Sequence, residues 1–195
     1  MKKVQDYYFN KARKEGYAAR SAFKLEEIDK KHKIIKPGFC VIDLGCFPGS
    51  WMQYIAKKVG KKGLVVGIDR TQLKINLTDN MRHIHSDINE LDSTKLGEFA
   101  ERFDLVCSDM APNSTGVRDV DAARSLQLCQ MAQHVALQWL KKRGAFLVKC
   151  FQGPSFDPLL KEMRGNFEQV KIVKPKSSRN ESREIFLLGI QLKTE

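Results

Sequence analysis

The chain has 195 residues, of which 42% are hydrophobic and 29% charged, as in an ordinary soluble globular domain. Its 34 Lys and Arg against 23 Asp and Glu give a net charge of +11. This excess of positive charge is expected of a protein with a polyanionic partner, such as nucleic acid or an anionic membrane surface. It is about equally compatible with a basic enzyme that has no such partner. No apolar run could span a membrane, no secretory signal is evident, and the five cysteines have no metal-binding spacing. We therefore expect one cytoplasmic, monomeric domain over residues 1–195, without a metal site.

The N-terminal segment, residues 1–36, is the basic part of the chain. Residues 1–38 hold eleven Lys and Arg against five Asp and Glu. Nearby rings such as Tyr7, Tyr8 and Phe9 could stack on unpaired bases, whereas Phe23 is expected to pack inward. We expect residues 1–16 to be loosely ordered until a partner binds. A helix should follow from Tyr17 to about Lys33, with Glu26–Lys30 and Glu27–Lys31 pairs on its exposed face, before Pro37-Gly38 breaks the chain.

After this break, strand and helix patterns alternate. Strands are expected at Phe39–Leu44, Gly63–Asp69, Arg82–His85, Phe103–Ser108, Ala145–Phe151, Phe167–Val173 and Glu184–Leu192. Helices are expected from Gly49 to about Val59, around Ser93–Ala100, within Val120–Lys142, where Gly144 ends the helix, and around Phe156–Arg164. The alternation predicts an α/β fold with a doubly wound, mostly parallel sheet of seven strands. The last two strands predict an antiparallel pair at one edge of the sheet.

Four successive strands end in residues suited to a ligand. The first ends in a glycine-rich turn from Gly45 to Gly49, where the backbone can approach a ligand closely. The next three end in Asp69, Asp87 and Asp109, of which Asp69 can accept from ribose hydroxyls and Asp87 from an adenine amino group. Each could be a plain turn or cap residue. Because ligands bind outside the carboxyl ends of parallel strands, the four together indicate a site.

The spacing of the glycines distinguishes two cofactors. A dinucleotide site expects G-x-G-x-x-G, so that the pyrophosphate sits on a helix N-terminus. Here the middle glycine is missing, and three acids surround the predicted pocket. Acids repel a pyrophosphate but suit a ligand that carries a sulfonium and an ammonium group. The sequence therefore favours S-adenosylmethionine over NAD.

A lysine in the fifth strand is the candidate reactive group. Lys149 lies in an otherwise apolar run, where its burial costs stability unless it is paired or used. Its expected neighbour at the strand ends is Asp109. Glu184 begins the last strand after a polar stretch, and a solvated strand end is the simpler explanation for it.

Five segments together resemble one family: Arg20–Leu25, Asp43–Trp51, Asp109–Asn113, Val148–Gly153 and Ser177–Glu184. They resemble the RrmJ/FtsJ family of ribosomal RNA 2′-O-ribose methyltransferases over nearly the whole chain. The resemblance implies a Rossmann-like class I methyltransferase fold and a catalytic tetrad of Lys24, Asp109, Lys149 and Glu184. It implies a cofactor site formed by Asp43, Gly45, Pro48, Gly49, Ser50, Trp51, Asp69, Asp87 and Asp109. The chain departs from the family at Cys46-Phe47, where two small residues are usual, so Phe47 could reshape the cofactor rim.

The resemblance also implies a substrate, a uridine of large-subunit ribosomal RNA in the assembled subunit. We expect the RNA to be held by a group of cations at both ends of the chain: Lys2, Lys3, Lys11, Arg13, Lys14, Arg20, Lys174, Lys176 and Arg179. Lys149 could act as a neutral base, because the like charge of Lys24 favours the uncharged form of its amine. It could also stay charged and stabilise the forming alkoxide, favoured by Asp109 and Glu184. Alternative functions are methylation of transfer RNA or another RNA, RNA binding without catalysis, and NAD-dependent oxidoreduction.

Overall fold

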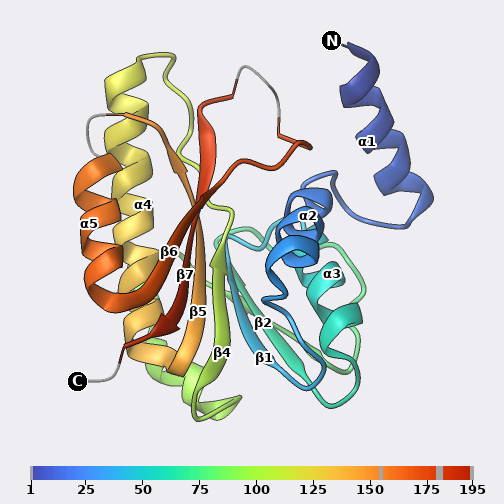
Figure 1. The fold of residues 1–195 in the computed structure, drawn as a ribbon. Helices are drawn as coiled ribbons and strands as arrows, with labels where there is room; N and C mark the ends of the chain where they lie inside the picture. The colour runs from blue at the N-terminus through green and yellow to red at the C-terminus, as the bar shows by residue number, and fades with distance from the viewer. Residues whose placement is uncertain (1, 154–155, 179–181, 194–195) are drawn as a thin grey trace.

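The fold is one seven-stranded sheet with helices on both faces (Figure 1). A computed structural model describes residues 2–153, 156–178 and 182–193, with their side chains except those of residues 2–6 and 93. The strands are β1 (Cys40–Leu44), β2 (Leu64–Asp69), β3 (Met81–His85), β4 (Phe103–Ser108), β5 (Leu140–Phe151), β6 (Phe167–Val173) and β7 (Glu184–Leu192). The helices are α1 (Lys2–Lys14), α2 (Ala22–His32), α3 (Ser50–Val59), α4 (Arg118–Trp139) and α5 (Phe156–Asn166), with short 3₁₀ helices η1 (Ile88–Glu90) and η2 (Ser93–Glu98).

The order of the strands is β3-β2-β1-β4-β5-β7-β6. The strands from β3 to β5 pair in parallel, and β7 lies between β5 and β6, antiparallel to both. The predicted doubly wound, mostly parallel α/β sheet of seven strands is confirmed, as is the antiparallel pair of β6 and β7 at one edge. Within the described residues, no helix combines the length and the apolar character needed to cross a membrane.

Each face of the sheet has its own apolar core. Leu25 of α2 and Met52 of α3 pack with Phe186 on one face. Ala132 of α4 and Leu159 of α5 belong to the core on the other face. Because helices cover both faces, the central strands are apolar on both sides, which is why they appear in the sequence as nearly continuous apolar runs. Figure 1 shows α4 and α5 on the side opposite α2 and α3.

The N-terminal segment differs from the sequence prediction. Residues expected to be loosely ordered form α1, and α2 begins at Ala22 instead of Tyr17. Tyr8 of α1 contacts the ring of Phe23, and Ala12 is buried, so one stripe of α1 packs against α2. The segment is mostly polar and charged, which is why the sequence predicted loose order there and not a packed helix. The inward packing predicted for Phe23 is confirmed, because it is 1% exposed.

The junction of α4 and β5 is the second difference. The prediction that Gly144 ends the long helix is wrong, because α4 ends at Trp139 and β5 starts at Leu140. Leu140 pairs with Phe103, and the register then shifts before Ala145 pairs with Leu105. Arg143 adopts a φ of 63° in this irregular stretch. A run of three cations in an irregular strand has no period-2 pattern, so the sequence gives no strand signal there.

Candidate active site

The carboxyl ends of β1 to β5 meet at the top of the sheet in Figure 1, an edge that we call the upper rim. There β1 enters α3 through the predicted glycine-rich turn. Gly45 and Gly49 adopt φ angles of 73° and 106°, which side chains of L residues rarely allow. A Cβ atom on Gly45 would overlap Met110, and one on Gly49 would overlap Ile75. Both glycines are therefore required for the close packing of loops around this turn.

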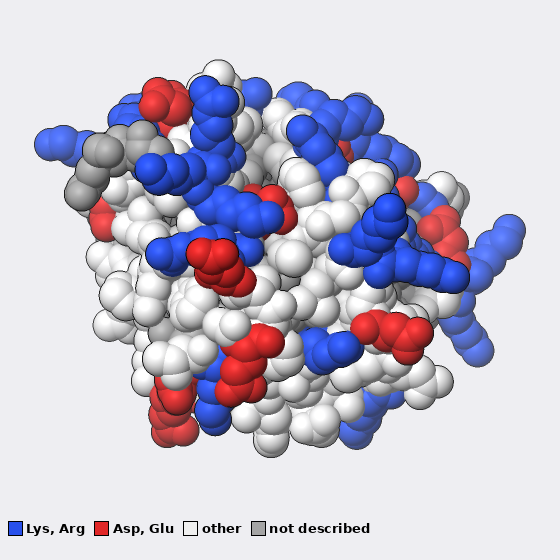
Figure 2. All heavy atoms as spheres, turned by 90° about the horizontal axis from the view of Figure 1, so that it is seen from below, with Lys and Arg blue, Asp and Glu red and all other residues white. Residues whose placement is uncertain are grey.

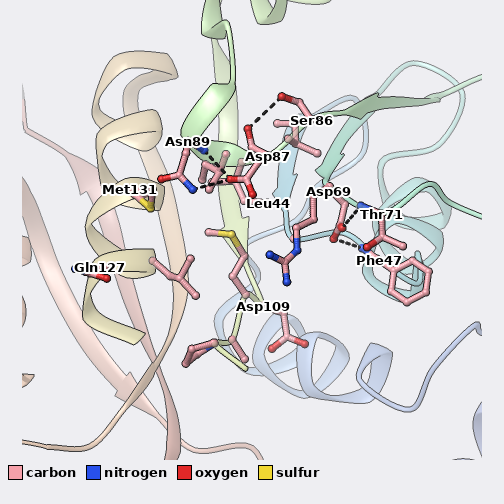
Figure 3. Close-up of a pocket in the computed structure, with 18 of the residues that line it drawn as sticks. Leu44, Phe47, Asp69, Thr71, Ser86, Asp87, Asn89, Asp109, Gln127 and Met131 are labelled. Carbon is pink, nitrogen blue, oxygen red and sulfur yellow. Dashed lines mark hydrogen bonds between the residues drawn. The ribbon is translucent and has the colours of Figure 1, made fainter. Parts of the chain in front are cut away.

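A cavity of about 880 Å³ opens at the upper rim beside this turn. Asp69, Asp87 and Asp109, which close β2, β3 and β4, all line it, and Gln127 and Met131 of α4 lie on its other side (Figure 3). Its volume is within the range of small-molecule sites, about 300–1,000 Å³. The prediction that these three aspartates meet at one cavity is confirmed.

Two of the three aspartates already accept hydrogen bonds from the protein (Figure 3). Asp69 accepts from the backbone N–H of Phe47 at 2.9 Å and of Thr71 at 2.7 Å. Asp87 accepts from the backbone N–H and the side-chain amide of Asn89, and these bonds lower the pKa of Asp87 below its ordinary value. An ionised carboxylate offers about four acceptor positions. Both side chains can therefore also accept hydrogens from a ligand.

Asp109 is paired with the lysine of β5. The Nζ atom of Lys149 lies 2.9 Å from Oδ1 of Asp109 and also donates to the backbone carbonyl of Asp109. Lys149 is only 7% exposed, and an unpaired ammonium group at this depth would be costly. The expected proximity of these two residues is confirmed. An ammonium group has three hydrogens, so this pairing leaves room for a further acceptor.

A second ion pair lies next to the first. Lys24 of α2 reaches Glu184 at the start of β7, with 2.6 Å between Nζ and Oε1, and both side chains are 12% exposed. In the register of β5 and β7, Lys149 lies opposite Phe186 and Phe151 opposite Glu184. Lys149 and Glu184 are therefore diagonal neighbours on one face of the sheet, about 7–8 Å apart at their backbones. The four residues grouped by sequence resemblance lie as two adjacent ion pairs.

Only part of the predicted cofactor turn lines the cavity. Gly45 and Phe47 line it, and Phe47 is 46% exposed. Trp51 is buried against Phe186, and its Nε1 donates to the carbonyl of Ser21 at 2.9 Å. The structure thus brings Gly45 together with the three aspartates at the cavity. Five residues of the predicted cofactor site do not line the cavity: Asp43, Pro48, Gly49, Ser50 and Trp51.

The profile of the FtsJ-like methyltransferase family matches residues 17–192, which include α2 to α5 and all seven strands. The chain belongs to this family.

Relatives of this FtsJ-like methyltransferase match along nearly its whole length. Ribosomal RNA large subunit methyltransferase E of Bdellovibrio bacteriovorus is 48% identical over 97% of each chain. The protein of the same name from Desulfatibacillum aliphaticivorans is 45% identical over 95% of this chain and 89% of its own. The crystal structure of a ribosomal RNA methyltransferase from Plasmodium falciparum has a TM-score of 0.81 at 29% identity, over 92% of this chain and 100% of that one.

One buried acid of this FtsJ-like methyltransferase lies beneath the upper rim. Asp43 on β1 is 1% exposed, and its Oδ2 atom has no hydrogen-bond partner in the described part of the chain. Burial, and then the charge of Asp109, raises the pKa of Asp43 well above its ordinary value. Between the ordinary and the raised pKa, the folded chain holds a proton that the unfolded chain has lost. The contribution of Asp43 to stability therefore falls as pH rises through this window, starting from about pH 4.

Replacing Asp43 with Asn is expected to raise the free energy of unfolding at pH 7 by about 1–3 kcal/mol, because the buried carboxyl group must take up a proton on folding at this pH and an amide need not. The gain should vanish toward about pH 4, where the carboxyl group is protonated in both states. Urea unfolding of both proteins from about pH 4 to 8 measures this difference. If the unfolding free energies of the two proteins changed in parallel with pH, the pKa of Asp43 would not be raised in the folded chain.

Glu27 holds the loop before β7, a role that the sequence did not predict. The predicted Glu26–Lys30 pair is confirmed at 2.7 Å, but Glu27 has no ion pair with Lys31 among the described residues. Glu27 instead accepts from the backbone N–H groups of Lys176 and Ser177, at 2.7 and 3.1 Å. These residues precede the β7 strand that carries the Glu184 side chain. Lys24 and Glu27, one turn apart on α2, therefore hold the same loop at two points.

Replacing Glu27 with Ala is expected to lower the free energy of unfolding by about 2 kcal/mol, since two backbone bonds to a charged acceptor are lost. Catalytic turnover should fall about tenfold, because small displacements of reactive groups reduce rates steeply. The matched control is Glu26→Ala, which removes exposed ion pairs and should cost less than about 1 kcal/mol. Equal urea midpoints and equal turnover for the two variants would show that Glu27 does not hold the loop.

The predicted RNA-contacting cations are only partly described. Arg179 and the side chains of Lys2 and Lys3 lie outside the described residues. Lys11 lies 4.2 Å from the centre of the Phe23 ring, and Lys174 donates to the carbonyl of Ser182. Two aromatic side chains of α1, Tyr7 and Phe9, are 60% and 62% exposed. These rings, unlike the buried Phe23, are available to stack on bases.

Proposed function

We propose that this protein is an S-adenosylmethionine-dependent RNA ribose-2′-O-methyltransferase. The proposed substrate is large-subunit ribosomal RNA, with a uridine of the assembled subunit as the acceptor, and the proposed place of action is the cytoplasm. Support for ribosomal RNA comes from the names of the relatives that match the whole chain. The single observation that carries the reaction type is the buried Lys149–Asp109 pair beside a cavity lined by three aspartates.

The residues of the cavity fit S-adenosylmethionine better than NAD. Three carboxylates line it, those of Asp69, Asp87 and Asp109. Negative charge suits the sulfonium and ammonium groups of the methyl donor and opposes a pyrophosphate. When bound, S-adenosylmethionine supplies an activated methyl group. Gly45, Asp69, Asp87 and Asp109 would hold it, with Asp69 accepting from the ribose hydroxyls and Asp87 from the adenine amino group.

Lys149 is the residue that we assign to the acceptor oxygen. Its pairing with both the carboxylate and the carbonyl of Asp109 favours the charged ammonium form over the neutral base. In this form it donates a hydrogen bond to the 2′-oxygen and stabilises the negative charge that develops there, while the proton leaves to water. Lys24 and Glu184, as a separate ion pair, position the acceptor ribose beside Lys149.

Calorimetry with S-adenosylmethionine and NAD, followed by methyl-transfer assays, tests the proposal. Binding of S-adenosylmethionine but not NAD, with transfer to large ribosomal subunits, is the expected result. Binding without transfer to any RNA would favour a non-catalytic RNA-binding protein. Transfer to transfer RNA in preference to the ribosomal subunit would overturn the assigned substrate but leave the reaction intact.

A further inference from the structure

The edge of the sheet opposite the upper rim carries a second group of cations, far from the catalytic residues. The N-terminal ends of the parallel strands, the start of β6 and the end of β7 all meet at this edge, at the bottom of Figure 1. We call it the lower rim and define it by nine exposed cations: Lys36, Lys61, Lys62, Arg102, Lys141, Lys142, Arg143, Arg164 and Lys193. Viewed from below, Lys and Arg side chains gather across this face (Figure 2).

The cations of the lower rim come together from segments far apart in the sequence. The backbone N–H of Gly38 donates to the carbonyl of Val59, which brings the loop of Lys36 beside the loop of Lys61 and Lys62. Asp104 accepts from the backbone N–H of Cys40 and pairs with Lys141, which connects the start of β1 to β5. Lys193 donates to the carbonyl of Arg164 at the far edge.

Most of this charge is not compensated within the protein. Of the nine cations, Lys141 is the one with a described carboxylate within 4 Å. The exposed acids along the same edge are fewer, namely Asp79, Glu98, Glu101 and Glu168. A helix dipole stabilises cations in the last turn of a helix, but among the nine only Arg164 has that position. Neither ion pairs nor helix ends therefore account for the cations of the lower rim.

The shape and composition of the lower rim indicate what it would bind. A hollow of about 460 Å³ is lined by Arg102, Lys141 and Lys142, among others. The loops and strand ends that carry the nine cations contribute none of the large exposed apolar side chains in the described chain. Because the described residues of the lower rim have no exposed rings that could stack on unpaired bases, its contacts with a nucleic acid would be made to the phosphates. This differs from α1, which exposes Tyr7 and Phe9.

We propose that the lower rim is a second RNA-binding surface, which docks on the phosphate backbone of a double-stranded segment while the upper rim holds the acceptor nucleotide. This inference rests on the proposed function. The six residues of β4 separate the two rims by roughly 20 Å of strand. One short strand of RNA at the acceptor site cannot reach both, so the two surfaces select a folded RNA that presents a duplex beside the acceptor loop. The lower rim thus favours the assembled particle over an isolated oligonucleotide.

The test uses the full-length protein with Lys61→Glu, Lys62→Glu and Lys142→Glu combined, since these exposed side chains make no described hydrogen bond or ion pair. The control combines Lys161→Glu and Lys171→Glu, exposed lysines of α5 and β6 that are not among the nine cations, and changes the charge by four units instead of six. The probe is an RNA duplex of about 20 base pairs, longer than the roughly 16 base pairs spanned by a double-stranded RNA-binding domain. Fluorescence anisotropy measures the affinity at several salt concentrations.

The lower-rim variant is expected to bind the duplex at least about tenfold more weakly, with a salt slope reduced by about 1 to 3. Its KM for large ribosomal subunits should rise similarly while kcat and S-adenosylmethionine affinity stay unchanged. Wild-type affinity, or an equal loss in the control variant, would overturn the proposal. The proposal would also be overturned if the lower-rim variant lost binding to anionic phospholipid vesicles but still bound the duplex normally. That result would identify the surface as a membrane contact. Because duplex binding needs no methyl transfer, failure here is distinguishable from failure of the proposed function.

Discussion

Replacing Lys149 with Ala is expected to lower methyl transfer about a thousandfold, the scale seen when a group that stabilises developing charge is removed. The ammonium group of Lys149 is held by Asp109 at the upper rim and faces the acceptor oxygen in our proposal. S-adenosylmethionine affinity should change little, because the ribose and adenine contacts assigned to Asp69 and Asp87 remain. Single-turnover kinetics and calorimetry on the same preparation separate these two effects.

Lys161→Ala is the control for this experiment, since Lys161 is exposed on α5. Its turnover should equal that of the unmodified protein. A thermal unfolding curve distinguishes loss of chemistry from loss of fold, because removal of Lys149 leaves Asp109 without its cation. Normal turnover of Lys149→Ala would remove Lys149 from the reaction.

Replacing Asp69 with Ala is expected to weaken S-adenosylmethionine binding on the order of a hundredfold, since about two hydrogen bonds to a charged acceptor are lost. The carboxylate also holds the backbone N–H groups of Phe47 and Thr71, which shape one side of the cavity. The variant therefore loses both a ligand contact and the position of the turn. At saturating cofactor, turnover should recover substantially, in contrast to Lys149→Ala.

The control is Asp79→Ala, which removes an exposed carboxylate from the same connection between β2 and β3. Calorimetry should give this variant the affinity of the unmodified protein. An affinity for Asp69→Ala within about threefold of normal would mean that Asp69 is a turn residue alone, the simpler interpretation of its hydrogen bonds.

The alternation of strands and helices made the central fold predictable. Phe103–Ser108 and Phe167–Val173 match β4 and β6 in full. β4 was predictable because a buried strand of a parallel sheet is a short apolar run between turns. The position of β7 between β5 and β6 could not be predicted. It depends on pairing between residues far apart in the chain, such as Lys149 with Phe186, which no local pattern encodes. The cationic start of β5 was missed for the same reason.

The three aspartates of the cavity were predictable because topology alone places the carboxyl ends of parallel strands at one rim. Glu27 was not, because its partners are backbone N–H groups about 150 positions away, which have no sequence signature. The lower rim was hidden in a similar way. Its cations occur singly or in short runs at the ends of different elements, and only the assembled sheet makes them neighbours.

Incubation of the protein and large ribosomal subunits with S-adenosylmethionine that carries an isotopically labelled methyl group tests the proposed reaction at the level of the product. Nuclease digestion and mass spectrometry of the nucleosides then locate the label. We expect a single labelled 2′-O-methyl nucleoside, with the label on the sugar, that disappears with Lys149→Ala. Label on a base, or an unchanged yield with Lys149→Ala, would contradict this expectation.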